Sequence, residues 1–458
     1  MSPALNVYMW LNKGIILTPE EEIVLSASAI RLSPEAESRM AMLWQQVNDW
    51  NGLLEIAGKR GLAPLLYAKL YCATTPVPAD MELKLRQYYL KTLSRSVALQ
   101  SEFGRIAALC TSRNIEIIPL KGAYLSGVLY GDVGLRQMSD IDILVKDDKA
   151  AECIRLLRED GYQPVESKGI SEFVDSSSDF VHYPPLYKNG FSVEVHRKLH
   201  LDAENYCLPL NDIWQESGME TVCEQQVRVL SPYMMLMHLC IHLDKHFKKG
   251  QVQFSSFTDI YNLMLKYADG FRWQEFAQTC EKYGCEHEVF RYLLLVNRFY
   301  NASLPGFLVD KYGGYCTSDD EMLFITYLRG YRKENANASA VPVHLKNLKT
   351  HGLSAVSLRY LFEIIFPSKT FMIQKYGLAE SEKVRKLESN KVRKLESNKV
   401  GKLESRRSEE EKEDTQNSEL RTTNFKLLTF NFKLKFWWLL YPYRWWVGVK
   451  GVINSLRS

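Results

Sequence analysis

The feature that most limits the possible folds is a short β-rich stretch set between two long stretches of helical periodicity. Apolar residues recur at helical spacing through residues 1–100 and again through residues 201–378. Between them, residues 101–200 contain short apolar runs with alternating polar positions, bounded by glycine and proline. This order predicts an α+β fold, in which a small mixed sheet core is embedded between helical N- and C-terminal regions.

Charge and aromatic content set the remaining boundaries. Residues 379–421 carry 12 Lys/Arg and 11 Asp/Glu, lack aromatic residues and contain an eight-residue repeat that begins KVRKLESN. Such a segment buries too little apolar area to offset the entropy lost on ordering it, so we expect a charged linker. Residues 422–458 follow as a tail with six Lys/Arg, no acid and ten aromatic residues.

The tail and the net charge limit the partners. Tryptophan and tyrosine favour membrane interfaces and cations attract anionic lipids, so residues 422–458 are candidates for weak membrane-surface or protein contact. The alternative is a terminal helix that packs back onto the protein. Without residues 379–458 the chain carries 40 basic and 43 acidic residues, which gives no support to binding of duplex nucleic acid. The oligomeric state is left open.

The compartment is inferred from three features. The first residues show no secretion signal, and the longest apolar run near the end has eight residues, against ~20 for a membrane span. The nine cysteines include no CxxC pair. We therefore expect a cytoplasmic protein with reduced, mostly buried thiols.

Two acids alternate with isoleucines in the run Ser139-Asp-Ile-Asp-Ile-Leu-Val145. Side chains two residues apart on a strand point to the same face, so Asp140 and Asp142 share one face. Their Cα atoms would be ~6.5–7 Å apart, a spacing at which both carboxylates can share a pair of cations. A solvated strand face paired with surface bases would show the same triplet, so the triplet alone is weak evidence.

A second strand supplies a third acid. Asn189-Gly190 is typical of a tight hairpin turn, and in the run that follows Glu194 and His196 occupy polar positions between valines. If this strand neighbours the first, Glu194 joins Asp140 and Asp142. Three carboxylates at one point repel strongly, so the sequence predicts a divalent metal ion among them.

A phosphate site is expected close by. A predicted strand ends at Lys121-Gly122, and a helix is expected to follow. A helix start after glycine offers free backbone N–H groups to phosphate, and Lys121 adds positive charge. Arg136 precedes the acidic strand and could reach the same anion; its alternative role is a salt bridge.

Together these motifs resemble a family. The runs Leu120-Lys-Gly-Ala and Tyr130-Gly-Asp-Val-Gly-Leu-Arg136, the acidic strand and Gly161-Tyr162 are similar to those of a poorly characterised bacterial family of nucleotidyltransferases, within the DNA-polymerase-beta-like nucleotidyltransferase superfamily. Val193-Glu-Val-His196 looks like the third acidic strand of that family. The resemblance covers residues 40–376, so residues 101–200 would be its nucleotidyltransferase core.

The resemblance implies an enzyme that transfers a nucleoside monophosphate from an NTP, ATP among the candidates, to the hydroxyl of an unidentified acceptor. Pyrophosphate would be released with the help of two Mg²⁺ ions. The residues with implied roles are the catalytic metal ligands Asp140, Asp142 and Glu194 and the nucleotide-binding residues Lys121, Gly122 and Arg136.

One departure from the superfamily pattern supports an alternative. Gly122-Ala123 stands where Gly-Gly or Gly-Ser is usual, which removes a hydroxyl donor for phosphate. The alternative function is a catalytically weakened nucleotide-binding or protein-interaction module on the same fold.

Three histidines recur every four residues, at positions 238, 242 and 246. On a straight helix they would span ~12 Å, too far for all three to bind one ion. We expect them to line the cleft against base or acceptor, or to pack at the seam between domains.

Overall fold

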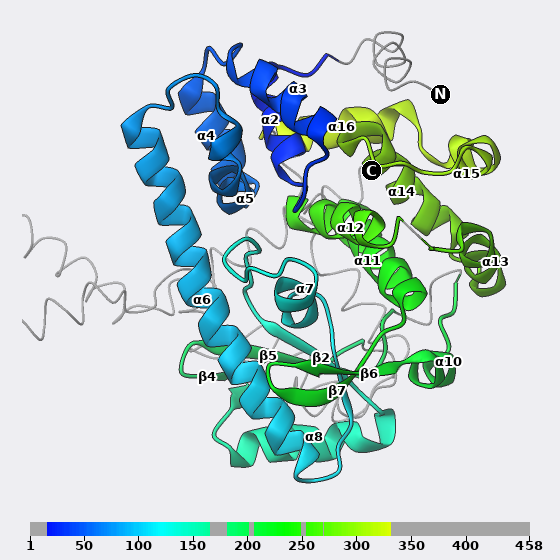
Figure 1. Ribbon diagram of the computed structural model, residues 1–458. Coiled ribbons are helices and arrows are strands. Elements are labelled where there is room, and N and C mark those ends of the chain that lie inside the picture. Colours follow the sequence, from blue (N-terminus) through cyan, green and yellow to red (C-terminus); the bar gives the residue numbers. More distant parts are fainter. Residues whose placement is uncertain (1–15, 165–180, 201–205, 249–252, 269, 331–458) are drawn as a thin grey trace, which may run out of the picture. The chain divides into compact units, whose positions relative to one another are not determined.

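The computed structural model describes residues 16–164, 181–200, 206–248, 253–268 and 270–330 (Figure 1). All of them belong to one of the two compact units into which the chain divides. The expected linker at 379–421, the tail at 422–458 and the end of the expected helical region lie outside the described residues.

Short helices form the described part of the N-terminal region, as predicted. Three of them begin at residues that cap their first N–H groups: Thr18 and Glu21 form a capping box, and the side chains of Ser33 and Asp49 accept from the first turns that follow them. The elements are α2 (Pro19–Ala27), α3 (Pro34–Trp44), α4 (Trp50–Lys59), α5 (Ala63–Ala68) and the 3₁₀ turn η1 (Leu70–Cys72).

The long helix α6 (Ala79–Thr111) joins this region to the sheet. It packs against α4 and α5 and also against α7 (Gly122–Val128) and α8 (Asp147–Glu159). Figure 1 shows it running from α4 and α5 down to α8. One helix therefore holds the N-terminal helices in a fixed place beside the sheet.

The sheet has five strands within the described residues, in the order β1-β2-β5-β4-β3. Only β2 and β5 pair in parallel; the other neighbours are antiparallel, so the sheet is small and mixed, as predicted. All five residues of β2 are buried, and α7 and α8 both pack against it. The strands are β1 (Ile117–Pro119), β2 (Ile141–Val145), β3 (Gln163–Pro164), β4 (Leu186–Lys188) and β5 (Phe191–His196).

A second hairpin lies in the region that we expected to be helical. Helix α10 (Leu210–Glu216) is followed by β6 (Gly218–Val222) and β7 (Gln225–Val229), and β7 lies beside β1. The turn residues Cys223 and Glu224 both have positive φ, 49° and 63°. Because neither is glycine or asparagine, the turn carries no sequence signal of the usual kind.

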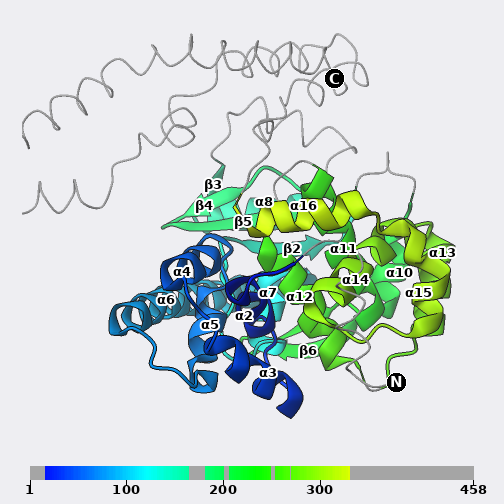
Figure 2. The same ribbon diagram turned by 90° about the horizontal axis from the view of Figure 1, so that it is seen from above.

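Helices make up the rest of the described chain, and α14 packs against α11, α12, α13 and α15. Figure 2 shows α4–α6 and α13–α15 on opposite sides, with α7 and α12 between them. No helix in the described ranges is long and apolar enough to cross a bilayer. The helices are α11 (Pro232–Lys248), α12 (Phe254–Lys266), α13 (Trp273–Tyr283), α14 (Glu286–Tyr300), α15 (Gly306–Tyr312), the 3₁₀ turn η2 (Gly313–Tyr315) and α16 (Ser318–Leu328).

A buried ion pair ties α12 to the loop that precedes β2. The Arg136 guanidinium donates to both carboxylate oxygens of Asp259, at 2.8 and 2.6 Å, and the Tyr130 hydroxyl donates to the same carboxylate at 2.8 Å. The side chains of Arg136 and Asp259 are only 10% and 1% exposed. One turn later, Asn262 accepts a hydrogen bond from the backbone N–H of Ile30, so α12 is also tied to the N-terminal helices.

We expect Asp259→Leu to lower the free energy of unfolding by about 3–5 kcal/mol, because it leaves the Arg136 guanidinium buried without its carboxylate partner. Adding Arg136→Met should restore part of the loss, and urea denaturation of both single variants and the double variant measures this coupling. Strictly additive losses would contradict the ion pair. The matched control is Asp80→Ala, whose solvent-exposed pair with Lys84 should contribute little.

Candidate active site

A cavity of about 280 Å³ lies where the sheet, the turn before α7 and helix α11 meet. Its volume is near the lower end of the range for pockets that bind small ligands. The six candidate residues from the sequence all line it: Lys121, Gly122, Arg136, Asp140, Asp142 and Glu194.

The parallel pairing of β2 with β5 sets the position of the acids. In this register Asp142 lies directly across from Glu194, with Ile141 opposite Val193 and Ile143 opposite Val195. The isoleucines and valines are buried in the core on the other face. Alternation along both strands therefore places two carboxylates side by side on the cavity face.

Asp142 is the most buried acid of the cavity, at 3% exposure. Its Oδ1 lies 3.1 Å from Lys121 Nζ and 2.9 Å from His196 Nε2. Burial alone would raise the pKa of Asp142, but the Lys121 ammonium and the His196 bond outweigh it and hold the pKa well below its usual range. Asp142 is thus a carboxylate throughout the physiological pH range.

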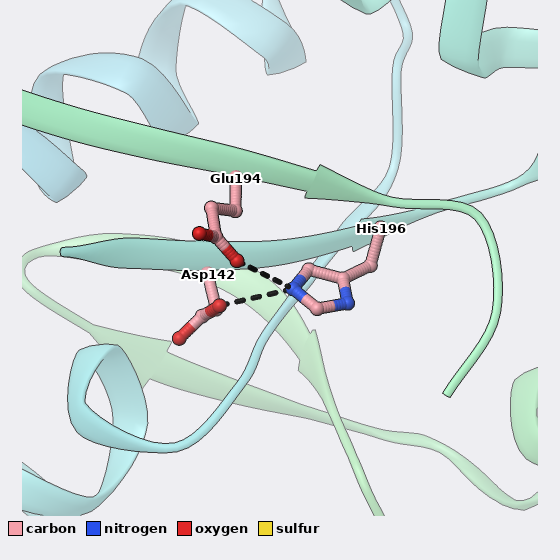
Figure 3. Close-up of side chains that lie close together, drawn as sticks. All are labelled: Asp142, Glu194 and His196. Carbon is pink, nitrogen blue, oxygen red and sulfur yellow. Dashed lines mark hydrogen bonds and ion pairs between the residues drawn. The ribbon is translucent and has the colours of Figure 1, made fainter. Parts of the chain in front are cut away.

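Glu194 and His196 follow each other at alternate positions of β5 and face Asp142 (Figure 3). Glu194 Oε2 lies 3.7 Å from His196 Nε2 and 3.9 Å from His182 Nε2. Burial raises the pKa of Glu194, but these two histidines more than compensate and lower it. One ligand atom each of Asp142, Glu194 and His196 lies within 4.8 Å of the others, so these three side chains could hold a metal ion.

Asp140 lies just before the first residue of β2 and outside this three-residue group. Its Oδ1 accepts a hydrogen bond from Ser139 Oγ at 2.9 Å. Burial raises the pKa of Asp140, and the charges of Asp142 and Glu194 raise it further. The structure therefore places Asp140 in the cavity lining. It places His196, which was not among the candidate residues from the sequence, in closer contact with Asp142 and Glu194.

The turn from β1 to α7 holds Lys121 in an unusual conformation. Its φ is 44° and its ψ is −120°, values that favour glycine, and the N–H of Ala123 donates to the carbonyl of Leu120 across the turn. A non-glycine residue in this region costs ~1–3 kcal/mol and occurs mostly at functional sites. This conformation orients the Lys121 ammonium toward Asp142.

Arg136 takes the alternative role. Its guanidinium is bound by Asp259, which leaves Nη1 facing the turn; a Cβ added to Gly122 would lie only 2.5 Å from it. Although Arg136 lines the cavity, its charge is already neutralised by Asp259. The arginine fixes the shape of the cavity wall behind Gly122.

Histidines form much of the cavity lining, from the sheet as well as from α11. Six line the cavity among the described residues: His182, His196, His200, His238, His242 and His246. Their position confirms the interpretation that the α11 histidines face the cleft. His242 and His246 share a contact of 3.2 Å between their Nε2 atoms, one of which donates to the other.

His238 has the most unusual surroundings of these histidines. It is 1% exposed, and neither ring nitrogen has a hydrogen-bond partner among the described residues. Burial lowers the pKa of His238 to about 3, and the nearby Lys121 charge adds to the effect. A neutral ring with one free donor and one free acceptor therefore faces the cavity, and a polar ligand would satisfy both.

A comparison with protein families finds a match. Residues 46–301 match the sequence model of a family described as uncharacterised nucleotidyltransferases. This range is more than half of the chain and includes β1, β2, β5 and α11. The chain therefore belongs to this uncharacterised nucleotidyltransferase family. No curated protein matches the sequence.

Two solved structures match part of the chain. One is the solution structure of the antibiotic-resistance factor ANT(2'')-Ia, at 11% identity and a TM-score of 0.26, covering 41% of this chain and 98% of that one. The other is an antigenic nucleotidyltransferase-like protein from Paracoccidioides brasiliensis, at 15% identity and a TM-score of 0.26, covering 45% of this chain and 93% of that one.

We expect Gly122→Ala to destabilise the protein by about 1–3 kcal/mol, because the new methyl group would meet Arg136 Nη1 at 2.5 Å and Met138 Cγ at 3.0 Å. The matched control is Gly127→Ala in the same helix, where no atom lies within 4 Å of the added methyl group. That change should stabilise the helix by roughly 0.5–1 kcal/mol. Urea denaturation of both variants tests the difference in sign, and equal effects would contradict the packing described for Gly122.

Proposed function

We propose that the protein transfers a nucleoside monophosphate from an NTP to a hydroxyl of an acceptor and releases pyrophosphate. The acceptor oxygen attacks the α-phosphorus, the bond from the α-phosphorus to the bridging oxygen breaks, and the hydroxyl proton goes to a base. The observation that carries this proposal is the register of β2 and β5, which sets Asp142 beside Glu194 in a cavity lined also by Lys121 and Gly122.

The donor set fits a divalent cation. Asp142 is a buried carboxylate and Glu194 a half-buried one, both with lowered pKa values, and Asp140 lies close enough for their charges to raise its own pKa. In this proposal Asp142 and Asp140 hold two Mg²⁺ ions and Glu194 holds the one nearer the acceptor. When bound, Mg²⁺ would lower the pKa of the acceptor hydroxyl and offset charge on the leaving pyrophosphate.

Two residues would handle phosphate charge. The Lys121 ammonium pairs with Asp142 here. Once a cation neutralises that carboxylate, the ammonium can turn to the triphosphate instead. Gly122 begins α7 at the cavity, and the backbone N–H groups of this helix start would bind a phosphate oxygen. Glu194, the acid nearest to two histidines, is our candidate to receive the acceptor proton.

The histidines of α11 would contact the base or the acceptor. His238 is buried and His242 half-buried, and burial together with Lys121 keeps their pKa values low, so they enter the site as neutral donors and acceptors. Neutral imidazoles suit hydrogen bonding to a base edge or a hydroxyl better than neutralising phosphate. In this proposal the acids and Lys121 act on the phosphates, and α11 recognises the neutral part of a substrate.

We expect the full chain, given Mg²⁺, NTPs and a pool of cellular acceptors, to release pyrophosphate, and we expect Asp142→Asn to reduce the rate about 10²–10³-fold. The physical reason is that the amide cannot hold the cation that stabilises the transferred charge. The matched control is Asp148→Asn, an exposed aspartate on α8 outside the cavity, which should keep the wild-type rate.

The readout is pyrophosphate released per protein, together with the mass of labelled products. If the folded wild type binds NTPs but releases no pyrophosphate with any NTP or acceptor pool, the result favours the catalytically weakened binding module instead. An undiminished rate in Asp142→Asn would remove the proposed role of the carboxylate pair.

A further inference from the structure

His196 lies between the acids of the cavity, and the roles proposed for those acids do not account for its position. It is 4% exposed, and its Nε2 lies 2.9 Å from Asp142 Oδ1 and 3.7 Å from Glu194 Oε2. Figure 3 shows the ring directed between the two carboxylates. A nitrogen donor thus stands at the point where the two oxygen donors converge.

We propose that His196 Nε2 is a direct ligand of the cation held by Asp142 and Glu194, and that this position selects a divalent first-row transition ion such as Mn²⁺ over Mg²⁺. The proposal rests on the proposed function and replaces one of its two Mg²⁺ ions with a transition ion. The second cation, near Asp140, keeps an oxygen environment and remains Mg²⁺ in this account.

The chemistry of the donors supports the selection. Mg²⁺ takes oxygen ligands in a nearly ideal octahedron and keeps several waters, whereas transition ions readily accept imidazole nitrogen. Two carboxylates and one imidazole within 4.8 Å of one another form a mixed set of this second kind. A third carboxylate in place of His196 would give the oxygen-only set that Mg²⁺ prefers.

The frame holds these donors in place. Asp142 and Glu194 lie opposite each other on paired strands, and His196 lies two residues beyond Glu194 on the same face. The His182 ring packs at 5.1 Å from the His196 ring, and residue 182 also pairs with residue 196 through a β-bridge. Ligands on strands keep their geometry better than ligands on loops, so little rearrangement is needed for binding.

Two nitrogen atoms already contact the shared oxygen. Lys121 Nζ and His196 Nε2 lie 3.1 and 2.9 Å from the same Asp142 Oδ1. A cation bound there would replace both contacts: the imidazole would bind it through Nε2 with the proton on Nδ1, and Lys121 would turn to the phosphates. Independently, neither ring nitrogen of buried His238 in the same cavity has a hydrogen-bond partner among the described residues, so α11 offers a second set of polar atoms to a ligand.

The test uses Mn²⁺ itself as the probe on the full chain, without turnover. Continuous-wave EPR counts free Mn²⁺ and gives its Kd and its competition with Mg²⁺, and electron spin echo modulation detects a ¹⁴N nucleus bound to the ion. We expect ¹⁴N modulation in the wild type and its loss in His196→Gln, whose amide can present oxygen. The preference for Mn²⁺ over Mg²⁺ should fall about tenfold or more in that variant.

The matched control is His182→Gln, because His182 lines the same cavity and lies 3.9 Å from Glu194. It should keep the ¹⁴N modulation, and circular dichroism confirms that both variants fold. Mn²⁺ binding without nitrogen modulation, or loss of modulation in His182→Gln alone, would overturn the role of His196 and leave the proposed function standing. No Mn²⁺ binding to the wild type would overturn this inference, while pyrophosphate release with Mg²⁺ would show separately whether nucleotidyl transfer holds.

Discussion

The parallel pairing of β2 with β5 is the constraint on which the rest of the site depends. In that register Asp142 faces Glu194, and the alternation of both strands sends the flanking isoleucines and valines into the core. A shift of one residue would turn the acids inward and the apolar side chains toward the cavity, so burial of the core enforces the arrangement of the site. One strand register thus determines both the packing of the core and the arrangement of the acids in the site.

Burying acids in this way requires compensation, and the structure supplies it from distant segments. Lys121 reaches Asp142 from a turn whose backbone is strained, and His196 reaches the same carboxylate from β5. Arg136 and Asp259 neutralise each other behind Gly122, and their side chains are only 10% and 1% exposed. The charges around the cavity are therefore of two kinds. The pair of Arg136 and Asp259 is fixed and shapes the cavity wall, whereas the charged contacts of Asp142 can change when a substrate binds.

Much of this arrangement could be predicted from the sequence because it depends on local periodicity. The alternation around Asp142 and Glu194 predicted both strands and the face that the acids share. The spacing of His238, His242 and His246 predicted one helical face, and all three line the cavity. The helical spacing through residues 1–100 predicted helices there, and α6 continues that region to Thr111, past the expected boundary at residue 100.

Other features depend on contacts that no local pattern encodes. The partner of Arg136 lies 123 residues later in the chain, so its salt bridge could be offered only as an alternative. The β6–β7 hairpin turns at Cys223 and Glu224, which carry no turn signal. His196 stood on the predicted polar face, and the Glu-x-His alternation was the available signal; its contact with Asp142 appears only when β5 is placed beside β2.

The most direct measurement of the central claim is anomalous diffraction from crystals of the full chain grown with Mn²⁺ and a non-hydrolysable NTP. The account predicts an anomalous peak within bonding distance of one carboxylate oxygen from Asp142 and one from Glu194. A peak bound elsewhere, or a nucleotide bound in the cavity with no cation between these two side chains, would contradict it.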